Sequence, residues 1–231
     1  MSSSRSLIEP IGGRYIILRR RVGRNHRNLL VSVGMFHKRG MIMGTGIDNF
    51  VDGTRRIFSH ADDARAQAQA IAAELQVLLA RPDLMREIED IADGRTGRID
   101  LHIDQQFGHP APGFCLMTTM NRVRKPTGGA RAHDHGASYV VYGVHKGAIE
   151  QTKFNWRYDD AADWTAPALR SGDCFVQNAG EVAFFLPGEI HKTTAVSKDP
   201  PIVLRLEAQL LERVARHTYD LDHDDAARLY G

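Results

Sequence analysis

The sequence lacks any long apolar run. No segment approaches the roughly 20 consecutive apolar residues that a membrane-spanning helix requires, so we expect no membrane partner. The amino-terminal stretch, Met-Ser-Ser-Ser-Arg-Ser-Leu-Ile-Glu-Pro, has no continuous apolar core of the kind found in secretory signals. We therefore expect a cytoplasmic protein.

Net charge of either sign is also nearly absent. The 30 Lys and Arg residues almost balance the 28 Asp and Glu residues, which leaves a formal charge of +2. Such a chain has no long-range field suited to nucleic acid or to an anionic membrane. The local run Arg19-Arg20-Arg21 lies in a strand-like segment without interleaved aromatic residues, which favours a solvated face over a phosphate-binding patch. The sequence therefore predicts no nucleic-acid partner.

Cysteine is scarce as well. Cys115 and Cys174 are the only two in the chain, too few for a disulfide framework or a cysteine-ligated zinc site. Both lie in apolar strand-like stretches, where an unpaired cysteine usually behaves as a small buried hydrophobic residue. A single disulfide between them stays open.

The first half of the chain changes pattern once. Residues 14 to about 47 contain short β-rich runs bounded by glycine, at 15–18, 29–33 and 41–43. A helical pattern follows, in which Ser59 and Asp62 form a capping pair before an apolar stripe over 64–79. A second, shorter helix is predicted after Pro82. We expect these two helices to cover one face or end of a sheet.

From about residue 99 to 219 the strand pattern returns. Six apolar β-rich segments are separated by turns that contain glycine or proline, at 114–120, 139–144, 148–156, 174–178, 182–186 and 202–210. Several short strands with regular turns predict a mainly β barrel or jelly roll rather than alternating β-strands and helices. We expect residues 1–97, a β-rich segment with helices, to pack on a barrel formed by 98–231 in one compact domain.

Three histidines form a candidate metal site. On a strand, His133 and His135 project from the same face, and two imidazoles on one face can take neighbouring positions on a divalent metal. His191 follows an apolar strand and the Pro187-Gly188 turn, and distant strands of a barrel can converge on one interior point. On spacing alone, three unrelated histidines remain an open alternative, because the chain contains 11 histidines.

The stretch His133-Asp134-His135-Gly136, the apolar strand after it and the later Pro187-Gly188-Glu189-Ile190-His191 resemble the cupin superfamily. The resemblance is strongest to the thiol dioxygenase branch typified by cysteine dioxygenase, and it spans residues 114–220. It implies a double-stranded β-helix, or jelly-roll barrel, to which the sequence patterns above add an amino-terminal β-rich extension and two covering helices. It also implies three His ligands for Fe(II), without the Glu ligand of the ordinary cupin motif. Tyr139 and Val140 occupy the positions where that Glu would lie. Zn, Ni or Mn are alternatives to Fe(II) as the bound metal.

Departures from that branch bear on the substrate. Cysteine dioxygenases carry an Arg upstream of the first strand that grips the substrate carboxylate, and residues 101–106 contain none. The Ser, His and Tyr of the family's late strand align with Val203, Arg205 and Glu207. Val140 replaces the cysteine that cross-links to that Tyr in some members. We therefore expect a substrate other than cysteine.

Arg205 and Glu207 are the candidate substrate-binding residues. Along 202–207 the apolar residues alternate with Val203, Arg205 and Glu207. In one interpretation the apolar face is inward and the charges are solvated. In the other, Arg205 points into the barrel and binds a substrate carboxylate while Glu207 orients it. Alternation leaves both open.

Other residues are weaker candidates. Asp134 points away from the two flanking histidines, as a supporting or solvent-facing residue. His102 and His109 could line the mouth of the barrel, but the surface is the favoured place for each. Tyr139 and Tyr142 could supply a hydroxyl near bound oxygen, but packing within their strand is favoured. No further catalytic residue is identified.

The first functional hypothesis is a non-haem iron dioxygenase whose partners are O₂ and a small anionic substrate, with a homodimer as one option. One alternative is a cupin that binds a metal and a ligand for sensing or storage without turnover. Another is a zinc-dependent, non-oxidative enzyme.

Overall fold

The computed structural model of the chain divides into two units, Met1–Met43 and Gly44–Gly231. It describes residues 6–11, 14–19, 45–120, 131–157, 168–220 and 228–230. The expected strands at 29–33 and 41–43, and the basic residues after Arg19, lie outside the described residues. The division expected at residue 97 stays a prediction.

The first unit contains one antiparallel hairpin. Strand β1 (Ser6–Ile11) pairs with β2 (Arg14–Arg19), with Leu7 opposite Leu18 and Ile8 opposite Ile17. Strand β2 covers the β-rich run predicted at 15–18, whereas β1 has no counterpart in the sequence analysis.

The second unit contains two antiparallel sheets. One has the order β3-β4-β11-β6-β9, with β3 (Gly97–Asp104), β4 (Phe114–Met120), β11 (Ile202–Glu207), β6 (Val140–Lys146) and β9 (Val182–Phe185). The other has the order β13-β12-β5-β10-β7-β8, with β13 (Arg228–Tyr230), β12 (Thr218–Asp220), β5 (Ala132–His133), β10 (Ile190–Ala195), β7 (Ala148–Arg157) and β8 (Ala168–Asn178). A short 3₁₀-helix, Leu211–Arg213, precedes β12.

The strand order defines the fold. From β4 to β11 the chain crosses between the sheets at each step but one, giving β4-β11-β6-β9 in one sheet and β5-β10-β7-β8 in the other. This interleaving is that of two Greek keys in a double-sheet jelly roll, the architecture that cupins share. The predicted mainly β, double-stranded β-helix fold is therefore confirmed.

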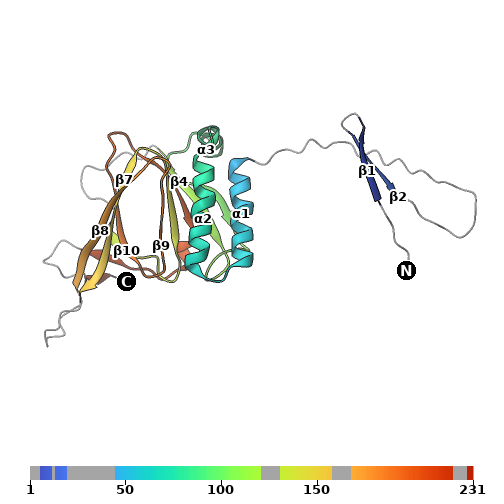
Figure 1. Cartoon of the computed structure of the whole chain (residues 1–231). Helices are drawn as coiled ribbons and strands as arrows, with labels where there is room; N and C mark the ends of the chain where they lie inside the picture. The colour runs from blue at the N-terminus through green and yellow to red at the C-terminus, as the bar shows by residue number, and fades with distance from the viewer. Residues whose placement is uncertain are drawn as a thin grey trace, which may run out of the picture. The chain divides into compact units, whose positions relative to one another are not determined.

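Three described helices cover the sheet that contains β4 and β9 (Figure 1): α1 (Gly46–His60), α2 (Ala64–Leu79) and α3 (Leu84–Ala92). The apolar faces of the helices form one core with outward-facing side chains of the sheet. The helices contribute Phe50, Ile71 and Leu75, and the sheet contributes Leu116, Leu204 and Leu206. None of the described helices is long and apolar enough to cross a membrane.

Helix α1 was not predicted, and the predicted cap was misplaced. The helix begins with a capping box, in which Asp48 N donates to Thr45 Oγ1 and Thr45 N donates to Asp48 Oδ2, both at 3.1 Å. Ser59, expected to cap the next helix, lies in the last turn of α1, and Asp63 caps α2 instead. Gly46 and Gly53 weaken the helical pattern of α1, since glycine disfavours helix interiors.

Asp104 ties the end of β3 to α1. Its carboxylate is 4% exposed and accepts hydrogen bonds from Gln106 N at 2.7 Å, Phe107 N at 2.9 Å and Arg55 Nε at 2.8 Å. Burial opposes ionisation, but these hydrogen bonds lower the pKa of Asp104 to about 2. Because the unfolded value is about 3.9, the ionised carboxylate stabilises the fold fully above that pH, and its contribution is lost as the pH falls through the folded value.

The Asp104→Asn variant is expected to lose about 2 kcal/mol of unfolding free energy at pH 7, with the deficit shrinking between about pH 4 and pH 2. Urea denaturation followed by circular dichroism at several pH values measures it. Asp52→Asn, which alters only an exposed partner of Arg55, is the control and should change little. An Asp104→Asn deficit that is the same at low and neutral pH would contradict this account.

Candidate metal centre

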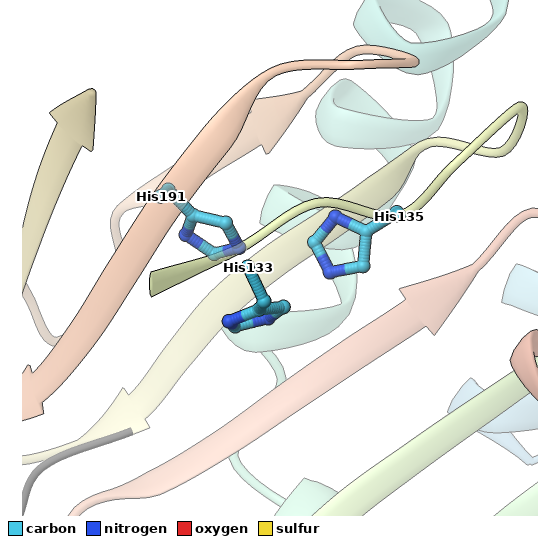
Figure 2. A group of neighbouring side chains, drawn as sticks. All are labelled: His133, His135 and His191. Atoms are coloured by element: carbon cyan, nitrogen blue, oxygen red, sulfur yellow. The ribbon is translucent and has the colours of Figure 1, made fainter. Parts of the chain in front are cut away.

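The sheet that contains β10 brings the three histidines together. His133 ends β5 and lies directly opposite His191 on β10, and such cross-strand pairs have Cβ atoms about 5 Å apart. His135 follows two residues later. Ring centroids are 4.7 Å apart for His133 and His191, 5.0 Å for His133 and His135, and 5.1 Å for His135 and His191. Figure 2 shows the three rings turned toward one another, with one nitrogen of each within 4.8 Å of the others.

Burial keeps these imidazoles neutral. His135 and His191 are fully buried. Burial is the main cause of a lowered pKa in all three, and neighbouring positive charges lower the pKa of His191 further, to about 2. Neutral imidazole is the form that binds metal ions.

The free nitrogens of the group fit a metal ion. Both ring nitrogens of His135 and Nε2 of His191 are buried and have no hydrogen-bond partner in the described part of the chain. A buried, unsatisfied nitrogen costs about 1–3 kcal/mol, which ligation would offset. Within the described residues the group contains only histidines, without a carboxylate or thiol. Nitrogen ligands of this kind suit Fe, Zn, Ni and Cu, and with less preference Mn.

Asp134 anchors the segment that carries two of the histidines. It is 5% exposed and accepts hydrogen bonds from Gly136 N at 2.8 Å, Tyr219 Oη at 2.7 Å and both His217 N and His217 Nδ1, at 3.1 and 3.0 Å. Burial opposes ionisation, but these donors lower the pKa of the carboxyl. Asp134 therefore supports the histidines on either side of it and does not face solvent. Its hydrogen bonds to His217 and Tyr219 fix the segment that carries His133 and His135 against β12.

Gly136 permits a close backbone approach next to His135. Its φ is +57°, in the left-handed region that favours glycine. A Cβ there would overlap the carbonyl oxygen of Ala215 and come within 2.8 Å of Val214 Cγ1. The turn after His135 is therefore closed to larger residues.

Aromatic side chains line one side of the group of three histidines. Phe185 stacks on His191 with ring centroids 3.7 Å apart and an interplanar angle of 22°. The Tyr142 ring meets His191 edge-on at 5.5 Å and is nearly buried. Both belong to an apolar cluster inside the barrel that includes Val140 and Leu211. Tyr142, for which packing within its strand was favoured, thus also borders the histidines.

Arg205 and Glu207 point into the barrel. Leu204 and Leu206 pack under the helices, which turns the alternate residues of β11 to the opposite face. Arg205 lies directly opposite Tyr142, and its guanidinium carbon is 5.9 Å from the centre of that ring. It forms an ion pair with Glu207, while its Nε is buried and unpartnered among the described residues. Of the two directions left open by the sequence, the structure has the inward one, while substrate binding by Arg205 and Glu207 stays a prediction.

Arg98 is a member of this charged group that the sequence analysis missed. Its guanidinium donates to both oxygens of Glu207, at 3.3 and 3.5 Å, and to Asp100 at 2.9 Å. Glu207 is 1% exposed, so a buried carboxylate lies between the guanidinium groups of Arg98 and Arg205. Arg98 lies just before residues 101–106, in which the sequence analysis looked for a substrate-binding arginine. Its alternation with the apolar residues Ile99 and Leu101 could have indicated that Arg98 lies on a strand with its side chain on the polar face.

The remaining candidates lie outside the His group. The ring of His102 contacts Phe114 at 5.6 Å, and that of His109 contacts Tyr139 at 5.9 Å. Both cysteines are free. Cys115 is buried as expected, but the expectation for Cys174 was wrong, because it lies exposed on β8, an edge strand of its sheet.

No family model and no curated protein matches this chain, whereas solved structures do. A variant of Bacillus subtilis oxalate decarboxylase aligns at 18% identity and a TM-score of 0.30, over 46% of this chain and 23% of that one. The formate complex of Lactobacillus farciminis oxalate decarboxylase aligns at 17% identity and a TM-score of 0.31, over 46% and 26%. An uncharacterized Klebsiella pneumoniae protein with a double-stranded β-helix domain aligns at 14% identity and a TM-score of 0.33, over 54% and 81%.

The chain thus spans about a quarter of the length of these oxalate decarboxylases. Similarity at this level does not identify an activity, because unrelated functions share the fold.

Proposed function

We propose that this chain is a non-haem iron dioxygenase that uses O₂ to oxidise a small anionic substrate other than cysteine. The observation that carries the proposal is the grouping of three neutral imidazoles, two of them fully buried, in a barrel that also holds an arginine with an unpartnered donor. Catalytic metal sites keep positions open for substrate, which three protein ligands allow. Zinc in these positions would indicate a non-oxidative reaction, because Zn²⁺ has no redox chemistry.

The charges near the three histidines favour an anionic substrate. Burial is the main cause of the lowered pKa values of His133 and His135, and the positive charges of Arg205 and Arg216 add to it. Positive charge near the histidines favours the binding of an anion. Nε of Arg205 is an unused donor, and a guanidinium matches the geometry of a carboxylate.

His133, His135 and His191 would hold the iron, which when bound would supply the redox chemistry that lets O₂ react with an organic substrate. The chain's own side chains bind and orient. Arg205 binds the carboxylate of the substrate, and Glu207 holds the guanidinium in place. Phe185 and Tyr142 exclude water beside His191.

Anaerobic loading with Fe(II), followed by oxygen uptake with a panel of short-chain thiol and hydroxy carboxylic acids, tests the proposal. We expect near-stoichiometric iron and substrate-dependent oxygen consumption. Stoichiometric zinc in the purified protein, with no uptake after iron loading, would favour non-oxidative chemistry. Bound iron without uptake on any of these acids would favour a binding module for sensing or storage.

The Arg205→Lys variant keeps the charge beside Glu207 but loses the planar fork of donors. With an acid that supports oxygen uptake, we expect KM to rise roughly 10- to 100-fold while kcat changes little. Steady-state oxygen-electrode kinetics measure both constants. The control is Arg56→Lys, on the exposed face of α1, for which both should stay unchanged. An unaltered KM for Arg205→Lys would remove Arg205 from the substrate site.

A further inference from the structure

The His191 ring is held in one orientation by its neighbours. It is fully buried between Phe185 and Tyr142, and its Nδ1 lies 3.0 Å from Oε1 of Gln151. Its Nε2 is buried and has no partner among the described residues. A neutral imidazole carries one proton, and only the nitrogen without it can bind a metal. The group opposite Nδ1 therefore decides which nitrogen is available.

Gln151 by itself does not decide this, because a side-chain amide can present either its oxygen or its nitrogen. Gln151 is fully buried on β7, and the hydroxyl of Thr193 lies 2.8 Å from the same Oε1 position. A hydroxyl both donates and accepts, so Thr193 fits either orientation of the amide.

Gln177, which is 2% exposed on β8, fixes the orientation of Gln151. Its Nε2 lies 2.8 Å from the carbonyl oxygen of Tyr142 and 2.9 Å from that of Glu181, and carbonyls only accept. Its Oε1 must therefore face Gln151, whose Nε2 lies 3.5 Å away. The oxygen of Gln151 then faces His191, and because this oxygen only accepts, Nδ1 carries the proton.

We propose that Gln151 and Gln177 form a positioning pair that sets the tautomer of His191 and leaves its Nε2 free to bind the metal. This inference rests on the metal centre proposed above. His133 needs no such pair, because the backbone carbonyl of Arg131 accepts from its Nδ1 at 2.9 Å. His135 has no partner on either nitrogen in the described structure. His191 is thus the member of the group whose tautomer depends on other side chains.

The tautomer can be read in the metal-free protein by ¹⁵N NMR of labelled histidine, assigned through loss of the signal in His191→Ala. We expect His191 to be protonated at Nδ1 in the unchanged protein and to become a mixture of tautomers in Gln151→Leu. The same variant should bind Fe(II) about 10- to 100-fold more weakly, the usual effect of losing a group that orients a metal ligand. Gln151→Glu, which keeps an oxygen opposite Nδ1, should retain the tautomer.

A matched control separates positioning from stability. Gln67 on α2 is also 2% exposed, accepts a hydrogen bond from Tyr139 Oη and donates to the carbonyl of Ala61. Gln67→Leu should therefore destabilise the fold to a similar extent but leave the tautomer of His191 and the Fe(II) affinity unchanged.

The outcomes distinguish the two proposals. If Gln151→Leu changes neither tautomer nor affinity, the positioning pair is wrong. If the tautomer shifts but the unchanged protein binds no iron after loading, the pair stands as a structural device and the metal centre is wrong.

Discussion

The His191→Ala variant is expected to lose nearly all bound metal, whereas the unchanged protein should hold close to one ion per chain. His191 supplies one of three clustered nitrogens, and no other His, Cys, Asp or Glu of the described chain belongs to the group. Removing a ligand should weaken binding by more than the about 100-fold that loss of a supporting residue can cost. Elemental analysis after anaerobic Fe(II) loading and desalting measures the change.

The matched control is His60→Ala, because His60 is exposed at the end of α1. It should bind as much metal as the unchanged protein, and circular dichroism should show that both variants are folded. Stoichiometric metal in folded His191→Ala would rule out the three-His centre. Absence of metal from the unchanged protein after loading would rule it out as well.

Replacing Glu207 with alanine is expected to lower the unfolding free energy by about 3–5 kcal/mol, the typical cost of removing one partner from a buried ion pair. The carboxylate is 1% exposed and contacts both Arg205 and Arg98. Without it, the guanidinium of Arg205 stays inside the barrel with its charge uncompensated. Urea denaturation at neutral pH measures the loss.

A double variant identifies the cause. If the unpaired charge is responsible, Arg205→Met combined with Glu207→Leu should regain most of the stability lost in Glu207→Ala, because apolar replacements of a whole buried pair are often neutral. Glu89→Ala, on the exposed face of α3, is the control for general effects of removing a carboxylate. A loss below about 1 kcal/mol for Glu207→Ala would place this pair with the weak, solvent-screened ones.

The barrel strands and the His133–His135 pair could be predicted because their signals are local. Strand β4 has the bounds expected from its apolar pattern, and the rings of His133 and His135 lie together as their spacing predicted, although β5 ends at His133. What brings His191 to them is the pairing of β10 with β5, a two-residue strand. That strand is too short to leave a pattern, so convergence at this point was an expectation taken from the family resemblance.

The direction of Arg205 was undecidable for a different physical reason. Apolar alternation identifies the two faces of a strand, but it does not say which face is inside. Here the leucine face of β11 is buried under helices outside the barrel, while its charged face lines the interior. The rule that apolar side chains point inward therefore fails for a sheet that is covered by helices and has charged residues on its other face. Gln151 and Gln177 were missed because buried amides have no periodic signature.

The interleaved strand order also has a kinetic consequence. Neighbours in the barrel come from distant parts of the sequence, with β4 beside β11 and β5 beside β10. Chains that depend on such non-local pairings fold slowly, because the entropy of closing long loops is lost before the contacts form. The His group and the Arg205–Glu207 pair both depend on these closures, so we expect both to form late in folding. An ion bound by His133 on β5 and His191 on β10 would hold these two strands together and so slow the unfolding of the barrel.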